Sequence, residues 1–234
     1  MEIRTGRIIG YVLMTFEKLL SIPKSFWVSL HFFSFKDAIK LPVVVRYNTK
    51  IQSLKGAVII KRGGVKTAML RIGFGSVGIY DKKYSRTILT IKGTVVLNGK
   101  VSLGHGSVLS VQKGAIVSFG DNFTNTAEGK IVCKKSITFG DNVLTSWETL
   151  IMDTDWHSIQ NTITGEIYPD TKEIIIGNNV WIGTRSVILK GSVIPDGCII
   201  GANTLCSKYF SETESVIAGN PARICKSNVT LYYK

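Results

Sequence analysis

The feature of this sequence that most constrains its fold is a six-residue repeat near the C-terminus. Six residues are too many for one helical turn, and an even period keeps equivalent side chains on one face of a strand. Three units of a short strand and a tight corner predict a triangular coil of about 18 residues, and stacked coils enclose one continuous apolar core. The repeating positions are Ile176, Ile182, Ile188, Ile194, Ile200 and Cys206.

The repeat continues upstream in weaker forms. A period of six links Phe139, Thr145, Ile151 and His157. A spacing of eight links Leu103, Val111 and Phe119, which predicts longer turns in the earlier coils. Glycine and asparagine suit the corners because they tolerate positive φ. We therefore expect an all-β dominated parallel β-helix over residues 41–227, followed by a tail over residues 228–234.

Residues 1–40 have a different pattern. Helical spacing predicts helices over residues 7–35, interrupted near Pro23, and lysines alternate with aromatic side chains there. Residues 1–72 hold 13 Lys and Arg against 3 Asp and Glu, whereas the rest hold 16 against 13. Such a basic amphipathic segment fits an anionic membrane surface, or packing on the protein or on another subunit. We expect His31 to be a packing residue, and we expect no nucleic-acid partner because no recognised motif is present.

Two stretches carry a family resemblance. "IIIGNNVWIGTRSVILKGSVIPDGCIIGANTLCSKYF" and the following "VIAGNPARICK" closely resemble the hexapeptide-repeat acyltransferases, and in particular the bacterial sugar and polysaccharide O-acetyltransferases. The likeness covers about residues 89–227. It implies a left-handed parallel β-helix, acetyl-CoA as co-substrate, and a homotrimer with its active sites between neighbouring helices. Acyl transfer itself requires no metal, and the sequence signals none.

The stretch "MDTDWHSIQNT" holds the candidate base. Acyl transfer to a hydroxyl needs a group that accepts a proton near neutral pH, which histidine supplies. His157 precedes a polar stretch, about residues 158–173, in which the repeat is lost and which we expect to form an extruded loop. The resemblance assigns His157 as general base, with Asp155, Asp153 or a backbone carbonyl orienting it. His105 is the other candidate base.

The resemblance also implies where the donor lies. Trp181 would pack on the pantetheine arm or the acetyl methyl, and the Gly183 N–H would contact the thioester carbonyl. Gly201 and Ala202 would offer further backbone contacts in the next coil. The candidates for the phosphates are Lys208, Arg223 and Lys226, since phosphates need positive charge. The chain departs from the family pattern at Cys206 and at residues 209–210.

These observations favour an O-acetyltransferase that acts on a sugar of a cell-surface polysaccharide or its precursor. Two alternatives stay open: an N-acetyltransferase for a nucleotide-linked amino sugar, and a β-helix that binds without catalysis. The four cysteines show neither close pairing nor metal-ligand spacing, which predicts reduced thiols. We expect a cytoplasmic protein, peripheral at the inner face of the membrane if residues 1–40 bind lipid.

Overall fold

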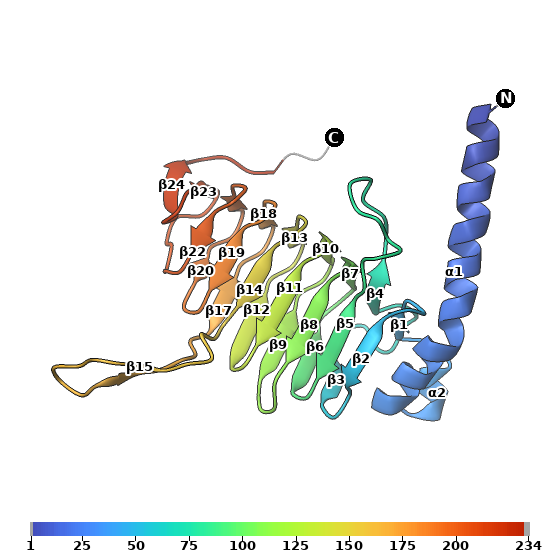
Figure 1. Ribbon diagram of the computed structural model, residues 1–234, viewed down its shortest axis with the longest axis horizontal. Coiled ribbons are helices and arrows are strands. Elements are labelled where there is room, and N and C mark those ends of the chain that lie inside the picture. Colours follow the sequence, from blue (N-terminus) through green and yellow to red (C-terminus); the bar gives the residue numbers. More distant parts are fainter. Residues whose placement is uncertain (1, 232–234) are drawn as a thin grey trace.

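The protein is described by a computed structural model that covers residues 2–231, with side chains from Phe16 onward. Most of the chain winds through three parallel sheets that form the sides of a β-helix (Figure 1). Each turn of the coil contributes one strand to each sheet, so that equivalent strands of successive turns pair. The expected β-dominated fold is confirmed, and a helix lies across the N-terminal end of the stack.

The strands fall into these three sheets and one small hairpin. The first sheet runs β1 (Val43–Val45), β4 (Leu70–Phe74), β7 (Val101–His105), β10 (Phe123–Ala127), β13 (Leu144–Thr145), β18 (Trp181–Ile182), β21 (Ile199–Ile200), β23 (Val216–Ala218) and β24 (Arg223–Lys226). The second runs β2 (Lys50–Ser53), β5 (Ile88–Ile91), β8 (Val108–Val111), β11 (Lys130–Cys133), β14 (Leu150–Met152), β19 (Val187–Leu189) and β22 (Leu205–Cys206). The third runs β3 (Ala57–Ile60), β6 (Thr94–Leu97), β9 (Ile116–Phe119), β12 (Ser136–Phe139), β17 (Ile174–Ile176) and β20 (Val193–Ile194). The hairpin consists of β15 (Ile159–Gln160) and β16 (Ile167–Tyr168).

The strand register explains the sequence repeat. Ile176 pairs with Ile194, and Ile182 pairs with Ile200, so that each partner lies three repeats later in the chain. All six repeating positions are buried, as the period predicts. The earlier coils are longer, since Leu103 pairs with Asn125, which lies further along the chain than three repeats would reach. The eight-residue spacing therefore reflects longer corners between the same three sides.

Asparagine side chains form a ladder along one corner of the coil. Asn122, Asn142 and Asn179 all have positive φ, between 56° and 57°. The amide of Asn122 donates to Asn142 at 3.1 Å, and the amide of Asn142 donates to Asn179 at 3.0 Å. Asparagine tolerates the left-handed conformation better than most residues. The corners are thus fixed both by backbone geometry and by side-chain hydrogen bonds between coils.

Helix α1 (Glu2–Phe32) covers the edge of the first sheet, where β1 would otherwise leave its backbone groups unpaired. The hydroxyls of Ser21, Ser25 and Ser29 accept from the backbone N–H groups of Tyr47, Val45 and Val43 at 3.0–3.3 Å. Ser25 and Ser29 also donate to the carbonyls of Val45 and Val43. Serines four residues apart lie on one helical face, so this face replaces a neighbouring strand. An uncovered edge strand invites pairing with another chain.

The predicted break near Pro23 is wrong, because α1 runs through it and only the short α2 (Phe35–Ala38) follows. Pro23 lies on the exposed side of α1, where the carbonyl that it leaves without a partner can be hydrated. The predicted apolar positions Ile8 and Val12 lie outside the described side chains. Neither helix in the described part of the chain is long and apolar enough to cross a membrane. His31 is exposed and donates from Nε2 to the Leu54 carbonyl at 2.7 Å.

Candidate active site

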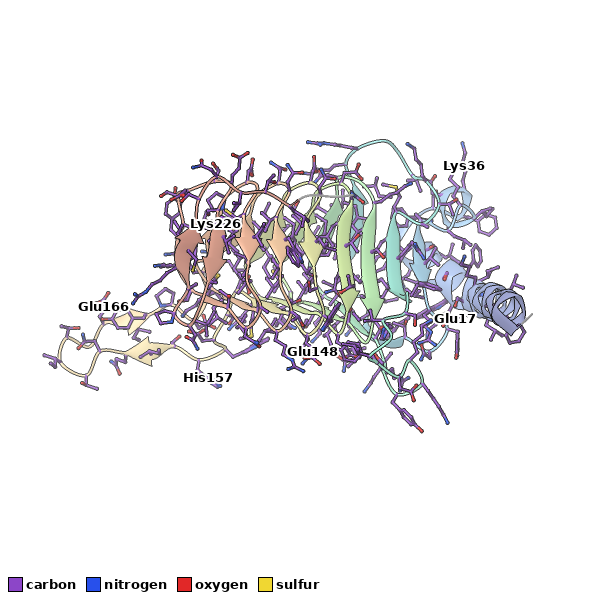
Figure 2. The ribbon with its side chains drawn as sticks, turned by 90° about the horizontal axis from the view of Figure 1, so that it is seen from above. Glu17, Lys36, Glu148, His157, Glu166 and Lys226 are labelled. Atoms are coloured by element: carbon purple, nitrogen blue, oxygen red, sulfur yellow. The ribbon has the colours of Figure 1, made fainter. Side chains whose placement is uncertain are left out.

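His157 lies at the base of a hairpin that leaves the coil between β14 and β17. Ile151 pairs with Ile188, much further along the chain than the three repeats that separate Ile176 from its partner Ile194. The extra residues include β15 and β16, which pair antiparallel and project from the coil (Figure 1). The prediction that His157 continues the six-residue register is therefore wrong: β14 ends at Met152, and the exposed His157 lies beyond it in the hairpin base (Figure 2).

Two lysines hold the base of this hairpin. Lys190 Nζ lies 2.6 Å from a carboxylate oxygen of Asp155 and donates to the Pro169 carbonyl at 2.8 Å. Lys134 pairs with the Asp170 carboxylate, and its ammonium lies 5.3 Å from the centre of the Trp156 ring. Lys134 follows β11 and Lys190 follows β19, which flank β14 in the second sheet. The hairpin base is thus attached to the coil before it and to the coil after it.

The two aspartates proposed to orient His157 have other partners. Asp153 is fully buried, and its carboxylate accepts from the backbone N–H groups of residues 134, 135 and 136 at 2.7–2.8 Å. Asp155 pairs with Lys190. Trp156 has φ 62°, so the segment does not alternate as a strand does, and the three side chains do not share one face. Among the described residues, no hydrogen bond joins either carboxylate to His157.

His105, the alternative base, is buried inside the earlier coils. Its Nδ1 lies 3.0 Å from the hydroxyl of Ser85, which also donates to the Glu128 carboxylate. Its Nε2 is buried and has no partner in the described part of the chain. Burial lowers the pKa of His105, although the Glu128 charge acts in the opposite direction. A fully buried ring cannot meet a hydroxyl in solution, so the geometry favours the exposed His157.

The predicted donor residues lie along another corner, between the first and second sheets. Trp181 is half-buried in β18, and its indole N–H donates to the Ser146 hydroxyl at 3.0 Å. The Gly183 and Gly201 N–H groups donate to the carbonyls of Ile200 and Ile217 at 2.8 and 2.9 Å. The proposed contact between the Gly183 N–H and a thioester is therefore wrong, because that N–H is already used within the coil.

The residues that follow Gly183 and Gly201 have backbone N–H groups that, within the described part of the chain, remain free to bind a donor. The N–H groups of Thr184 and Ala202 have no acceptor among the described residues. A Cβ at Gly183 would lie 2.8 Å from the Ala202 nitrogen, so these two corners are in close contact. The sequence predicts Ala202 as a donor contact but does not predict Thr184. The signal for Thr184 in the sequence is its position, three six-residue repeats before Ala202.

The three basic residues proposed to bind phosphates do not form one cluster within a chain. Arg223 pairs with Ala218 at one end of β23, whereas Lys226 pairs with Val216 at the other end. Lys208 follows β22, at the corner between the second and third sheets, and its ammonium lies 5.2 Å from the Phe210 ring centre. Of the three, Arg223 is placed to extend the column of corners that starts at Thr184 and Ala202.

The candidate base and the candidate donor residues occupy different corners of the triangular coil. His157 lies between the second and third sheets, and Thr184 and Ala202 lie between the first and second. A single chain therefore does not bring the base and the donor corner together. No cluster of three or more potential metal ligands is found in residues 16–231.

Comparison with known proteins agrees with this architecture. Residues 173–208 match the family described as bacterial transferase hexapeptide (six repeats). A protein of Escherichia coli K12 named as a lipopolysaccharide biosynthesis O-acetyl transferase is 28% identical, over 57% of this chain and 72% of its own. The galactoside O-acetyltransferase of the same organism is 34% identical over 48% of this chain, and the alignment spans about half of that enzyme's length, 55%.

Two solved structures share the fold. A polysialic-acid-specific acetyltransferase superposes with a TM-score of 0.55 and 21% identity, covering 82% of this chain and 79% of that one. A polysialic acid O-acetyltransferase superposes with a TM-score of 0.53 and 23% identity, covering 80% and 92%. At these identities the likeness shows the fold alone, which is the left-handed parallel β-helix. In its repeat, its fold and these relatives, the chain is similar to the hexapeptide-repeat acyltransferases.

Proposed function

We propose that the protein transfers an acetyl group from acetyl-CoA to a hydroxyl of a sugar in a polysaccharide or its precursor, with His157 as general base. The observation that carries this proposal is the placement of His157. It is an exposed histidine in a hairpin base that Lys134 and Lys190 attach to a rigid coil. The names of the relatives, which include lipopolysaccharide, galactoside and polysialic acid O-acetyltransferases, support a sugar hydroxyl as acceptor.

The chemistry needs only a few groups. The imidazole of His157 accepts the proton of the hydroxyl while the hydroxyl oxygen bonds to the thioester carbonyl carbon. A backbone N–H stabilises the negative charge that develops on the carbonyl oxygen. As the tetrahedral intermediate collapses, the carbon–sulfur bond breaks, and the imidazolium returns its proton to the leaving thiolate. The N–H groups of Thr184 and Ala202, which have no acceptor in residues 16–231, are suited to hold donor amides or the carbonyl oxygen.

The site would be completed by a second copy of the chain. His157 and the Thr184–Ala202 corner lie on different corners of one coil. The His157 of one copy would therefore meet the Thr184–Ala202 corner of a neighbouring copy. The resemblance implies a homotrimer, in which three such sites would form. Arg223 extends the donor corner and would meet a phosphate, and Lys208, which lies on the same corner of the coil as His157, would contribute from the other copy. Lys226 lies on the remaining corner and would not contribute.

The first test is the variant His157→Ala. It should lose nearly all release of coenzyme A in the presence of mixed sugar acceptors, while its melting temperature and its binding of coenzyme A stay unchanged. Normal turnover by this variant would refute the assignment of the base. Absence of acceptor-dependent turnover in the unmodified protein would favour a binding scaffold instead.

Subunit mixing tests whether the site is shared. Ala202→Trp would block the exposed donor corner but leave the core untouched. Each variant alone should be inactive, whereas co-expression with His157→Ala should restore part of the activity. Mixed assemblies would contain some sites with an intact histidine from one copy and an intact corner from the other. If co-expression restores no activity although mixed assemblies form, each chain carries its own complete site.

A further inference from the structure

From Phe16 onward, the side of α1 that faces away from the coil is almost wholly apolar. Phe16, Leu20, Trp27 and Leu30 are 59%, 47%, 53% and 42% exposed, and Pro23 lies between them. Their spacing of four, three, four and three residues puts them on one face of the helix. That face is opposite the serines that bind β1. Exposed apolar surface of this extent marks a site of contact with a partner or a membrane.

Short-range packing extends this apolar surface onto α2. The rings of Phe26 and Phe35 meet edge to face, with centroids 6.1 Å apart. Phe35 is itself 63% exposed, and Ile39, one turn further, is 58% exposed. We use the term "end face" for this surface, which consists of Phe16, Leu20, Pro23, Trp27, Leu30, Phe35 and Ile39.

Basic side chains lie at the α2 end of the end face. Lys36 and Lys40 are exposed there, and of these two only Lys40 has an acidic partner, Asp37, among the described residues. A groove of about 530 Å³ runs along the flank of α1, with an apolar lining that includes Leu19 and Ile22. The cations at this groove are Lys18, Arg71 and Lys100, none of which is paired with a carboxylate in residues 16–231.

The position of α1 places this surface at one end of the molecule (Figure 1). In Figure 1, α1 runs across the direction in which the coils stack, at the N-terminal end of the stack. Its outward side therefore forms the end of the molecule and is not covered by a coil. A helix that lies parallel to a surface, apolar on that side and flanked by lysines, suits the boundary between lipid head groups and acyl chains.

We propose that the end face binds the surface of an anionic phospholipid bilayer, with α1 in the plane of the interface and the coils stacked away from it. Pairing of α1 with a second copy fits less well, because Pro23 and Trp27 occupy positions where a coiled-coil seam needs Leu, Ile or Val. The basic excess of residues 1–72, 13 Lys and Arg against 3 Asp and Glu, supplies the matching charge. This inference does not depend on the proposed acetyl transfer.

The test is flotation of the full chain with vesicles of neutral phosphatidylcholine, with and without about one third phosphatidylglycerol. The protein should float with the anionic vesicles and lose this binding in high salt. The triple variant Phe16→Ser, Leu20→Ser, Trp27→Ser should stay in the soluble fraction. Its matched control, Ile159→Ser, Ile163→Ser, Ile167→Ser, removes three exposed apolar side chains from the hairpin and should still float.

A second measurement locates the contact. Lipids brominated in their acyl chains should quench part of the tryptophan fluorescence of the bound protein. Trp27→Phe keeps the apolar face, so it should float normally but lose most of that quenching. Failure of the unmodified protein to float would overturn the proposal, and so would equal flotation of both triple variants. A drop in oligomer mass in the first triple variant alone, without any lipid binding by the unmodified protein, would assign the end face to contact between copies.

Discussion

Asp155 and Lys190 join the hairpin base to the coil that follows it, with 2.6 Å between a carboxylate oxygen and the ammonium. The same ammonium donates to the Pro169 carbonyl, so that it bridges both strands of the hairpin base. Since His157 lies close behind Asp155 in the chain, this bridge limits where the imidazole can go. Lys190 is therefore a positioning residue for the proposed reaction, although it need not contact the substrate.

Lys190→Met should lower kcat about ten- to a hundredfold, since a base displaced by about 1 Å loses much of its effect. The donor corner at Thr184 and Ala202 is untouched, so the Kd for coenzyme A should stay the same. The measurement is steady-state kinetics together with calorimetric binding of coenzyme A. Lys113→Met is the control, because Lys113 is exposed in a turn far along the chain from the hairpin. Equal kcat in the two variants would exclude a positioning role.

Asp153→Asn should destabilise the fold more than it affects the proposed chemistry. The carboxylate of Asp153 is fully buried and accepts three backbone N–H groups, and an amide group can accept fewer. We expect a loss of about 2–4 kcal/mol in the free energy of unfolding, which lowers Tm by about 5–15 °C. Differential scanning calorimetry measures this loss.

The matched control for that variant is Asp121→Asn. Asp121 also accepts backbone N–H groups at a corner, from Lys100 at 2.8 Å and Asn122 at 2.9 Å, but it is exposed. Water can replace its lost hydrogen bonds, so the change should stay within about 1 kcal/mol. Equal destabilisation in the two variants would mean that burial of the corner carboxylate is unimportant.

The sequence predicted the coil because its period depends only on local repetition. Each coil places an aliphatic side chain over the equivalent side chain of the preceding coil. Ile182, Ile188 and Ile194 are one repeat apart and lie on the three successive sides of one coil, so their spacing indicates the three-sided architecture. The apolar core and the asparagine corners follow from the same rule. The family resemblance added the handedness, since spacing is the same in either hand.

Features that depend on contacts between distant residues could not be predicted in this way. Asp153 is close to Asp155 in the sequence, yet it binds the corner of the preceding coil, at residues 134–136. Pro23 is a helix breaker by its chemistry, but hydrogen bonds between serines and the chain around β1 hold α1 on both sides of it. The separation of His157 from the donor corner also became apparent only once the three sides of the coil were known.

Thiol reactivity provides a third prediction. Cys133, Cys198 and Cys206 are buried, and Cys225 alone among the four is exposed. Burial raises the pKa of the Cys206 thiol to about 12, and it also raises the pKa of Cys133, with the nearby Asp153 charge acting in the same direction. Reactivity requires the thiolate. The folded protein should therefore react quickly at one thiol, and Cys225→Ser should abolish that reaction, whereas rapid labelling of a second thiol would contradict the buried assignment.

The pH dependence of stability tests the buried state of His105. Burial lowers the pKa of His105 below the 6.5 of an exposed histidine, so the unfolded chain binds more protons as the pH falls below that value. At pH 7, His105 therefore does not lower the free energy of unfolding. As the pH falls from about 6.5 toward the lowered pKa of the folded state, His105 lowers the free energy of unfolding by a growing amount.

Two variants separate this contribution of His105 from that of other groups. In His105→Gln, denaturant midpoints measured between about pH 5 and pH 8 should fall less steeply on the acid side than in the unmodified protein. Glu128→Gln removes the charge that opposes the lowering of the pKa of His105, so its acid limb should be steeper. Parallel curves for all three proteins would show that the ring of His105 is hydrated in solution.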